Sequence, residues 1–472
     1  MIGIIAKREF MRNLLNLRFP ISALLCVILT ATVVYIRSGG YEEEIRNYRT
    51  TVELQEERLK YTTLNWAPFA IYKPPPKLSV FFRGCPWKEE YDWIALGGFT
   101  PRGDPFRFLF AGVDLGWVIG AVMGLLAIIF AHDAFTSERK GGTLKLMLSN
   151  PIPRHNVIIG KWIGGCGSLA AVLVISLLSG VIVAELRSIR MERADWIALG
   201  MVALASLLVI SAFFWLAVLV SVRARASFSS LLISLGIWVA SVLLIPNLSP
   251  DLAGILVKAP SIEVLKRKEG AIVKKYRGQW LKKLQEYKAE IRKYREEKDI
   301  EGINRVSKEL LLASLKKDGP FRRGQLRMHE ELGKLMKDFN NRIKKGVRTS
   351  MVFSSLSPFA SFIYAVNTLS GTGIRSQLVF SESAEEFVVK FREWFLGQSD
   401  KAAEMVERMA PSEIPDDFME RPLDVADMPR FSFREDIGGR VASSLVYILV
   451  LALYNVMFFM AAHLSFLRCP IA

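Results

Sequence analysis

The sequence has few of the residues from which metal centres, disulfide frameworks and nucleotide sites are built. It contains only four cysteines and four histidines in 472 residues. Cys26 and Cys166 lie inside long apolar runs, and the histidines show no spacing typical of metal ligands. No G-x-x-x-x-G-K-S/T phosphate-binding loop occurs, so we expect this chain to bind no ATP and no other cofactor. We therefore expect a non-catalytic protein whose chemistry comes from a partner.

Long hydrophobic runs are abundant. Hydrophobic residues make up 51% of the chain and charged residues 23%, which is too apolar for a soluble enzyme. A helix needs about 20 apolar residues to cross a bilayer, and only helices satisfy such runs in lipid. Six runs qualify, at about residues 19–36, 108–131, 162–186, 196–222, 228–248 and 441–467. The first could be a cleaved signal peptide, but no small-x-small site follows it, so we expect a retained span.

Basic residues in the short loops favour a cytoplasmic location for both termini. The loops on that side carry Lys7, Arg8, Arg12, Arg18, Arg139, Lys140, Lys145, Arg154, Lys161, Arg223, Arg225 and Arg468. The short loop between spans three and four has three arginines diluted by three acids. This N-in, C-in topology places residues 37–107 and 249–440 outside. Of the four cysteines only Cys85 then lies outside, which excludes an intrachain disulfide framework.

The second outer segment, residues 249–440, carries most of the +16 formal charge. From Ile262 its apolar residues recur every three or four positions, and a second series follows Asp299. The "KDGP" at Lys317–Pro320 interrupts this second series. We expect an extracytoplasmic α-helical coiled-coil hairpin that turns near Asp299–Gly302.

The basic faces of this hairpin have two interpretations. They are either solvated sides of a coiled coil or a contact surface for anionic headgroups, an acidic protein partner or an anionic substrate. No nucleic-acid-binding motif accompanies the charge, so nucleic acid is not an expected partner.

The remaining outer sequence is less regular. Residues 37–107 begin with a charged helical pattern and continue into an aromatic and proline-rich part, which we interpret as a small cap. The "LSVFF" of residues 78–82 is a candidate short strand. Residues 354–373 are apolar but broken by Pro358 and two glycines. We expect them to lie on the outer membrane surface; a seventh span is the alternative and would put the C-terminus outside.

The loop between spans two and three combines charge, amphipathicity and prolines. Thr136 and Ser137 are candidate N-caps, Glu138 suits the positive end of a helix, and Pro151 and Pro153 stop it. Between them, apolar residues recur at helical spacing beside basic ones. This pattern predicts a short surface helix, which either rests on headgroups or transmits a push to the two spans.

The same loop, "FTSERKGGTLKLMLSNPIPRHNVIIGKWI", resembles the signature of type-2 ABC exporter permeases. The landmark residues of that signature are Glu138, Gly142, Thr143, Leu144, Leu148, Ser149, Pro151, Arg154, Gly160 and Lys161. Further similarities point to the permeases associated with multi-copper-enzyme maturation, the relatives of the nitrous-oxide-reductase assembly permease. They include Asp114, the Asp133–Ala134 pair, a "PPPKLSV" outer segment and an "LSP" stretch before the last span. The basic hairpin is not covered by the resemblance.

The resemblance implies the permease subunit of an ATP-driven transporter in a prokaryotic inner membrane. Residues Glu138 to Ser149 would form a coupling helix in a groove of a separate cytoplasmic ATPase, which would bind ATP and Mg²⁺. Two permease copies, as a homodimer or a pair of related chains, would move together during export. Residues 1–18 would form an amphipathic elbow helix whose Ile4, Ile5, Phe10, Leu14 and Leu17 face lipid while basic residues meet headgroups.

Asp114 is the one acid predicted well within a span. Because a charged residue in lipid is costly, it is either a translocation-path residue or a snorkelling or helix-packing residue.

Two other functional classes remain open. One is a membrane-anchored scaffold whose outer coiled coil recruits a partner without transport. In a hybrid of scaffold and transporter, ATP hydrolysis would move the hairpin against that partner and no solute would cross. A channel is disfavoured because no span carries a regular polar stripe.

The sequence thus predicts an all-α polytopic membrane protein with membrane lipids around six spans. Its expected parts are the elbow helix 1–18, span one 19–36, the outer cap 37–107, span two 108–131, the coupling loop 132–161, spans three to five 162–248, the outer hairpin domain with its surface element 249–440, and span six with the tail 441–472.

Overall fold

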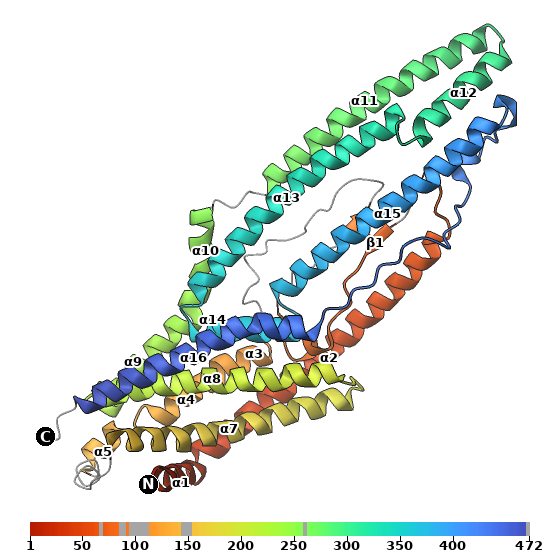
Figure 1. Ribbon diagram of the computed structural model, residues 1–472. Helices are drawn as coiled ribbons and strands as arrows, with labels where there is room; N and C mark the ends of the chain where they lie inside the picture. The colour runs from red at the N-terminus through yellow and green to blue at the C-terminus, as the bar shows by residue number, and fades with distance from the viewer. Residues whose placement is uncertain (66–68, 85–90, 94–112, 143–152, 258–261, 469–472) are drawn as a thin grey trace.

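The computed structural model describes residues 1–472 apart from 66–68, 85–90, 94–112, 143–152, 258–261 and 469–472 (Figure 1). Six helical units in it are long and apolar enough to cross a membrane, which confirms the six predicted spans. They are Arg18–Leu59, Leu115–Lys140, Arg154–Leu186, Arg193–Arg223, Ser227–Val257 and Ile437–Leu467.

Several of these units consist of more than one element. The first unit is α2 (Arg18–Leu59), and α1 (Ile2–Leu14) precedes it. The second contains α3 (Leu115–Trp117), the π-helical η2 (Val118–Met123), α4 (Gly124–Ala131) and α5 (Thr136–Lys140). The third and fourth are α7 (Arg154–Leu186) and α8 (Arg193–Arg223). The fifth joins α9 (Ser227–Val239), the π-helical η3 (Ala240–Leu244) and α10 (Ile245–Val257), and the sixth is α16 (Ile437–Leu467).

The fourth and second units form the centre of the bundle. In each of them 72% of the most apolar window is buried, against 17–33% in the other four. α8 contacts α4, α7, α9, α14 and α16 along its length. The other units keep large exposed apolar faces, as expected of helices that lipid surrounds.

Two boundaries differ from those expected. The first span does not end near residue 36, because α2 continues without interruption to Leu59 and absorbs the charged helical stretch of the cap. The second membrane-spanning unit begins at Leu115 rather than near residue 108, since Asp114 is the N-cap of its first helix, α3. Residues 108–112 of the expected span lie outside the described part of the chain.

The second and fifth units share a local irregularity. Each contains a π-helical turn, in η2 and η3, and such turns leave backbone carbonyls with altered partners. The Trp238 indole N–H donates to the Ala121 carbonyl oxygen at 3.2 Å, which joins α9 to η2. The bond satisfies a polar group inside the bundle, where water is not available.

The segment expected on the outer membrane surface is instead buried inside the protein. It forms α14 (Pro358–Ser370), in which every residue is buried against the neighbouring α8 and α16. Its hydroxyl groups have internal partners: Ser357 Oγ donates to the Ser241 carbonyl at 2.5 Å, and Tyr364 Oη lies 2.6 Å from Ser354 Oγ. The sequence pattern was misleading because these polar side chains are satisfied by protein rather than by water.

A long helical arm rises from one end of the bundle (Figure 1). It consists of α11 (Ile262–Glu296), α12 (Ile300–Leu315), α13 (Pro320–Ser354) and α15 (Ile374–Arg408). α12 and α13 both contact α11, and Asp299 caps α12 by accepting from the Gly302 amide at 3.0 Å. The chain reverses at Lys298, the residue before this cap, which has a φ of 58°.

The arm is joined to the Leu59 end of α2 by short elements. They are β1 (Phe69–Ile71), which pairs antiparallel with β2 (Tyr91–Trp93), and the 3₁₀ turns η1 (Lys77–Val80), η4 (Pro411–Glu413) and η5 (Phe418–Glu420). The "LSVFF" segment is therefore not a strand. It forms a turn that continues from η1, in which the Phe82 amide donates to the Leu78 carbonyl. The side chains of Phe81 and Phe82 are fully buried.

α1 packs tightly on a face of α7 that lacks side chains. A Cβ at Gly160 would lie 2.8 Å from Ile5, and one at Gly164 would lie 2.6 Å from the Ala6 carbonyl oxygen. Ile5 and Phe10 therefore face α7, and the expectation that they face lipid was wrong. Ile4 remains exposed, at 74%.

We predict that Gly164→Ala displaces α1 from α7. A methyl group there must push on backbone, and overpacking of this kind costs about 1–3 kcal/mol. The purified chain should melt at a lower temperature and be cleaved faster by trypsin after Lys7 and Arg8. Gly200→Ala on α8 is the matched control, since its Cβ would meet nothing within 4 Å. Equal effects of the two substitutions would contradict the packing argument.

His329 on α13 is buried inside the arm. It is 7% exposed, and its Nε2 atom has no hydrogen-bond partner within the described residues. Burial, followed by the nearby charge of Arg392, lowers the pKa of His329 from 6.5 to about 4. The folded arm therefore holds His329 neutral at pH values where the unfolded chain would already bind a proton.

We predict that the contact between α13 and α15 weakens as the pH falls from about 6.5 to about 4. Stability is complete above the unfolded pKa and decreases by up to roughly 3 kcal/mol across this window, because only the unfolded state gains the proton. Hydrogen exchange of α13 and α15 amides, corrected for intrinsic rates, measures the effect. His329→Leu should remove this pH dependence; an unchanged slope in the variant would contradict it.

Candidate functional site

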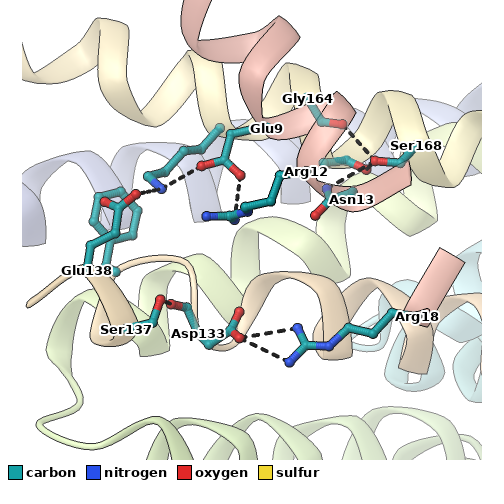
Figure 2. A network of polar contacts seen from close by, with 12 residues as sticks. Glu9, Arg12, Asn13, Arg18, Asp133, Ser137, Glu138, Gly164 and Ser168 are labelled. Atoms are coloured by element: carbon teal, nitrogen blue, oxygen red, sulfur yellow. Dashed lines mark hydrogen bonds and ion pairs between the residues drawn. The ribbon is translucent and has the colours of Figure 1, made fainter. Parts of the chain in front are cut away.

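A buried lysine lies where α1, α5 and α7 meet, at the end of the bundle opposite the arm. Lys161 of α7 is 2% exposed. Its Nζ donates to Glu138 Oε1 of α5 at 2.6 Å and to Glu9 Oε1 of α1 at 2.9 Å (Figure 2). It also lies 5.4 Å from the centre of the buried Phe135 ring. Lys161 therefore joins three helices through two carboxylates in a site from which water is largely excluded.

A fourth charge balances this cluster. Arg12, one turn after Glu9 on α1, reaches Glu9 Oε2 at 2.5 Å. Two cations and two carboxylates then offset each other, which is required where charges leave water. We call Glu9, Arg12, Glu138 and Lys161 the base network. It is surrounded by well-packed contacts between α1 and α7, so its members have little freedom to separate.

A second ion pair and a neutral hydrogen bond extend the base network (Figure 2). Arg18, at the start of α2, places both terminal nitrogens 3.2 Å from Asp133 Oδ2. Asn13 Nδ2 of α1 donates to Ser168 Oγ of α7 at 3.1 Å. The first bond ties α2 to the segment before α5, and the second ties α1 to α7.

The two ends of the predicted coupling loop are anchored by arginines at helix C-termini. Arg139 donates to the Val222 and Ala224 carbonyls, at the end of α8, at 2.9 and 3.0 Å. Arg154, the first residue of α7, donates to the Phe466 and Leu467 carbonyls, at the end of α16, at 2.8 Å each. A guanidinium at this position satisfies unpaired carbonyls and suits the negative end of the helix dipole.

Neutral contacts complete the anchoring of the segment before α5. The Phe135 amide donates to Ser221 Oγ of α8 at 3.1 Å, and Thr136 Oγ1 lies 2.8 Å from Ser227 Oγ of α9. The Phe135 ring packs on Phe466 of α16 with 4.8 Å between centroids. The start of the loop therefore touches the ends of α8, α9 and α16 at once.

The structure places the sequence-predicted signature residues in three groups. Glu138, Arg154, Gly160 and Lys161 belong to the anchoring contacts just described. Gly142 lies in an exposed turn with a φ of 71°, a value that favours glycine. The other residues predicted to couple to the ATPase lie outside the described part of the chain, and they are Thr143, Leu144, Leu148, Ser149 and Pro151.

Sequence reasoning missed the acid on α1. Glu9 sits in a basic and apolar amphipathic segment, where an acid looks like part of a solvated face. The pairing could have been predicted only by combining two observations. Glu9 is the lone acid in that segment, and Lys161 directly follows Gly160, a glycine that allows two helices to come close. Arg139 was likewise interpreted only as one of the basic loop residues that indicate membrane topology, although it caps the C-terminus of α8.

Asp114 is placed at a helix start rather than within a helix. Its carboxylate accepts from the Trp117 amide at 2.8 Å and from the Arg83 amide at 2.9 Å. The first bond caps α3, and the second fixes the segment that follows η1. These contacts join the start of the second membrane-spanning unit to the segment that follows η1.

Metal binding finds no support in the described residues, where no group of three His, Cys, Asp or Glu side chains converges. The cysteines described are Cys26 and Cys166, both free.

Comparison with known proteins agrees with the signature. The family model described as "ABC-2 family transporter protein" matches residues 4–469. The probable ABC transporter permease protein NosY of Pseudomonas aeruginosa is 34% identical over 124 residues, which cover 26% of this chain and 45% of that protein. NosY of Stutzerimonas stutzeri is 29% identical over 135 residues, with the same shares. The match thus spans less than half the length of either relative.

The family match covers nearly the whole chain, including all six membrane-spanning units, and it confirms the resemblance read from the loop. The chain belongs to the ABC-2 family of transporter proteins.

Proposed function

We propose that this chain is the permease subunit of an ABC transporter and that the segment from Glu138 to Arg154 couples it to a separate ATPase. ATP and Mg²⁺ bind to that partner and not to this chain. The observation that carries the proposal is the anchoring of both ends of the segment to the ends of other helices. Glu138 bonds to Lys161, Arg139 caps α8 and Arg154 caps α16.

These anchors fix both described ends of the segment to other helices. A force applied between residues 141 and 153 reaches α7 directly, because α7 starts at Arg154. It reaches α1 through Glu9 and Lys161, and it reaches α8 and α16 through their capped C-termini. Packed interiors transmit displacement because they resist compression. For work to reach the spans, the ATPase must bind the segment differently in its ATP-bound and ATP-free states.

The far end of the bundle supports an action on the outer side. The buried α14 connects α13 to α15, so the arm is continuous with an element packed against α8 and α16. Movement of α8 or α16 would displace α14 and, with it, the arm. We propose that this movement drives either export or mechanical work on an extracytoplasmic partner. The proposal includes the N-in, C-in topology, a prokaryotic inner membrane, a basic coiled-coil hairpin outside and assembly of two permease copies.

Asp114 fits a positioning role in this scheme. Its bonds to the Trp117 and Arg83 amides hold the outer end of the second span against the cap segment. We propose that it maintains this junction, and that it does not line a translocation path.

We predict that Lys161→Met destabilises the protein and lowers the ATP turnover that the permease stimulates in its partner. The substitution leaves Glu138 without its ammonium partner in a buried site, and breaking a buried pair in this way costs about 3–5 kcal/mol. Thermal melting of the purified chain and ATPase assays of the reconstituted complex measure the two effects. The double variant Lys161→Met with Glu138→Gln should recover part of the stability, because no unpaired carboxylate remains beside residue 161.

Lys140→Met is the matched control for this prediction. Lys140 lies on the same α5 segment as Glu138 but is exposed. Its loss removes the same charge and should leave melting unchanged. A wild-type melting temperature in Lys161→Met would refute the role of the base network.

We predict that Leu144→Asp abolishes co-purification of the ATPase without changing the melting temperature of the permease. An acid in place of an apolar side chain should remove the contact with the groove while the base network stays intact. Gly142→Pro should uncouple ATP turnover from transport, because proline cannot adopt the positive φ of this turn. Gly142→Asn is the control, since asparagine tolerates that conformation. Normal coupling in both Leu144→Asp and Gly142→Pro would remove this segment from the mechanism. A permease that never stimulates its ATPase would favour the scaffold alternative.

A further inference from the structure

We propose that a basic collar at the root of the arm binds the headgroups of anionic phospholipids. The collar consists of Lys266, Arg267 and Lys268 on α11 and of Lys345 and Arg348 on α13. This inference goes beyond the coupling function and does not depend on an ATPase.

An exposed apolar surface lies directly below the collar. α10 ends the fifth membrane-spanning unit and packs along the lower part of α13. α10, α13 and the turn after α13 expose large aliphatic side chains there, each about half exposed or more: Leu248, Leu252, Ile255, Leu256, Val352 and Leu356. A patch of this kind on a soluble surface would be costly, whereas lipid tails accommodate it. The patch therefore marks the part of the arm root that acyl chains reach.

The cations of the collar begin where this apolar surface ends. Arg348 precedes Val352 by four residues, so it lies about 6 Å further along α13. Lys345 follows within the next turn. Leu265 of α11 belongs to the same buried cluster as Ile343 and Val347 of α13, which places the first turns of α11 beside this part of α13. All five collar side chains therefore lie around one junction.

The collar cations are exposed and have no ion-pair partner within the described residues. Their neighbours differ: Lys344 pairs with Glu382 at 2.9 Å and Arg342 pairs with Asp338 at 3.6 Å. The acids in the same turns of α11 are Glu263 and Glu269, of which Glu269 is partly buried and feels the charge of Lys266, and Asp251 lies on the neighbouring α10, so the collar remains net positive. Unpaired cations just above an apolar band can neutralise phosphates at the surface of an anionic leaflet.

The combination favours lipid over a soluble acidic partner. An acidic protein or polysaccharide would neutralise the collar cations but would leave the aliphatic patch exposed to water. A phospholipid satisfies both, since its phosphate meets the cations and its chains cover the patch. The long stems of lysine and arginine can lie along apolar surface while their charged ends reach the headgroups, and a guanidinium can bind a phosphate in two-pronged fashion.

The test uses the full chain purified in detergent and native mass spectrometry of bound lipid. Phosphatidylglycerol is titrated against phosphatidylcholine, which has the same chains but no net charge. We expect the wild type to retain phosphatidylglycerol preferentially and the double variant Lys345→Glu with Arg348→Glu to lose about tenfold in affinity for it. Phosphatidylcholine retention should not change.

The matched control is Lys283→Glu with Arg292→Glu. These two residues are also exposed cations without an ion-pair partner among the described residues, but they lie in the distal half of α11. They should retain wild-type preference for phosphatidylglycerol. An equal loss in control and collar variants, or no loss in either, overturns the proposal. Displacement of bound phosphatidylglycerol by soluble polyglutamate at the same charge concentration would also overturn it, in favour of an acidic macromolecule. A failure of ATPase coupling would leave all of these outcomes unaffected.

Discussion

The buried ammonium group of Lys161 is the constraint on which the end of the bundle opposite the arm depends. An ammonium in a dry site is tolerated only with charge partners in contact, and both partners come from other helices: Glu9 from α1 and Glu138 from α5. Separating any of the three helices would strand a charge. The interaction therefore contributes more to fixing their arrangement than to the net free energy of folding, because desolvation offsets much of the attraction. Arg139 and Arg154 extend the same logic to α8 and α16, whose last carbonyls would otherwise lack donors.

The opposite end of the bundle is fixed by different means. There the buried α14 is held by close packing and by hydroxyl hydrogen bonds, such as those of Ser357 and Tyr364. The two ends are connected by α8 and α16, which contact α14 and also bond, at their C-termini, to Arg139 and Arg154 at the two ends of the loop between spans two and three. A displacement that begins at one end thus has a short, densely packed route to the other. This is a physical route and not a demonstration of coupling, which depends on two states that bind a partner differently.

The sequence predicted the six spans well because the thickness of a bilayer sets a minimum length for each apolar run. It also singled out the loop between spans two and three, since Glu138, Gly160 and Lys161 are recognisable together; the coupling role of this loop stays a prediction. It failed where the partner of a residue is distant along the chain. Glu9 and Lys161 are 152 positions apart, so neither local pattern reveals the pair. The burial of α14 was missed for a related reason, because polar side chains with internal partners look like a solvent-facing stripe. Asp114 was assigned to a span interior because apolar residues precede it, although its carboxylate caps a helix start.

The unbroken course of α2 from Arg18 to Leu59 has a geometric consequence. At 1.5 Å per residue its 42 residues form a rod about 60 Å long, of which only about half is needed to cross a bilayer. If the rod stays straight, every degree of tilt about its inner end moves its outer tip by about 1 Å. Small changes in the tilt of α2 within the bilayer would then displace its far tip by several ångströms in the compartment beyond the membrane.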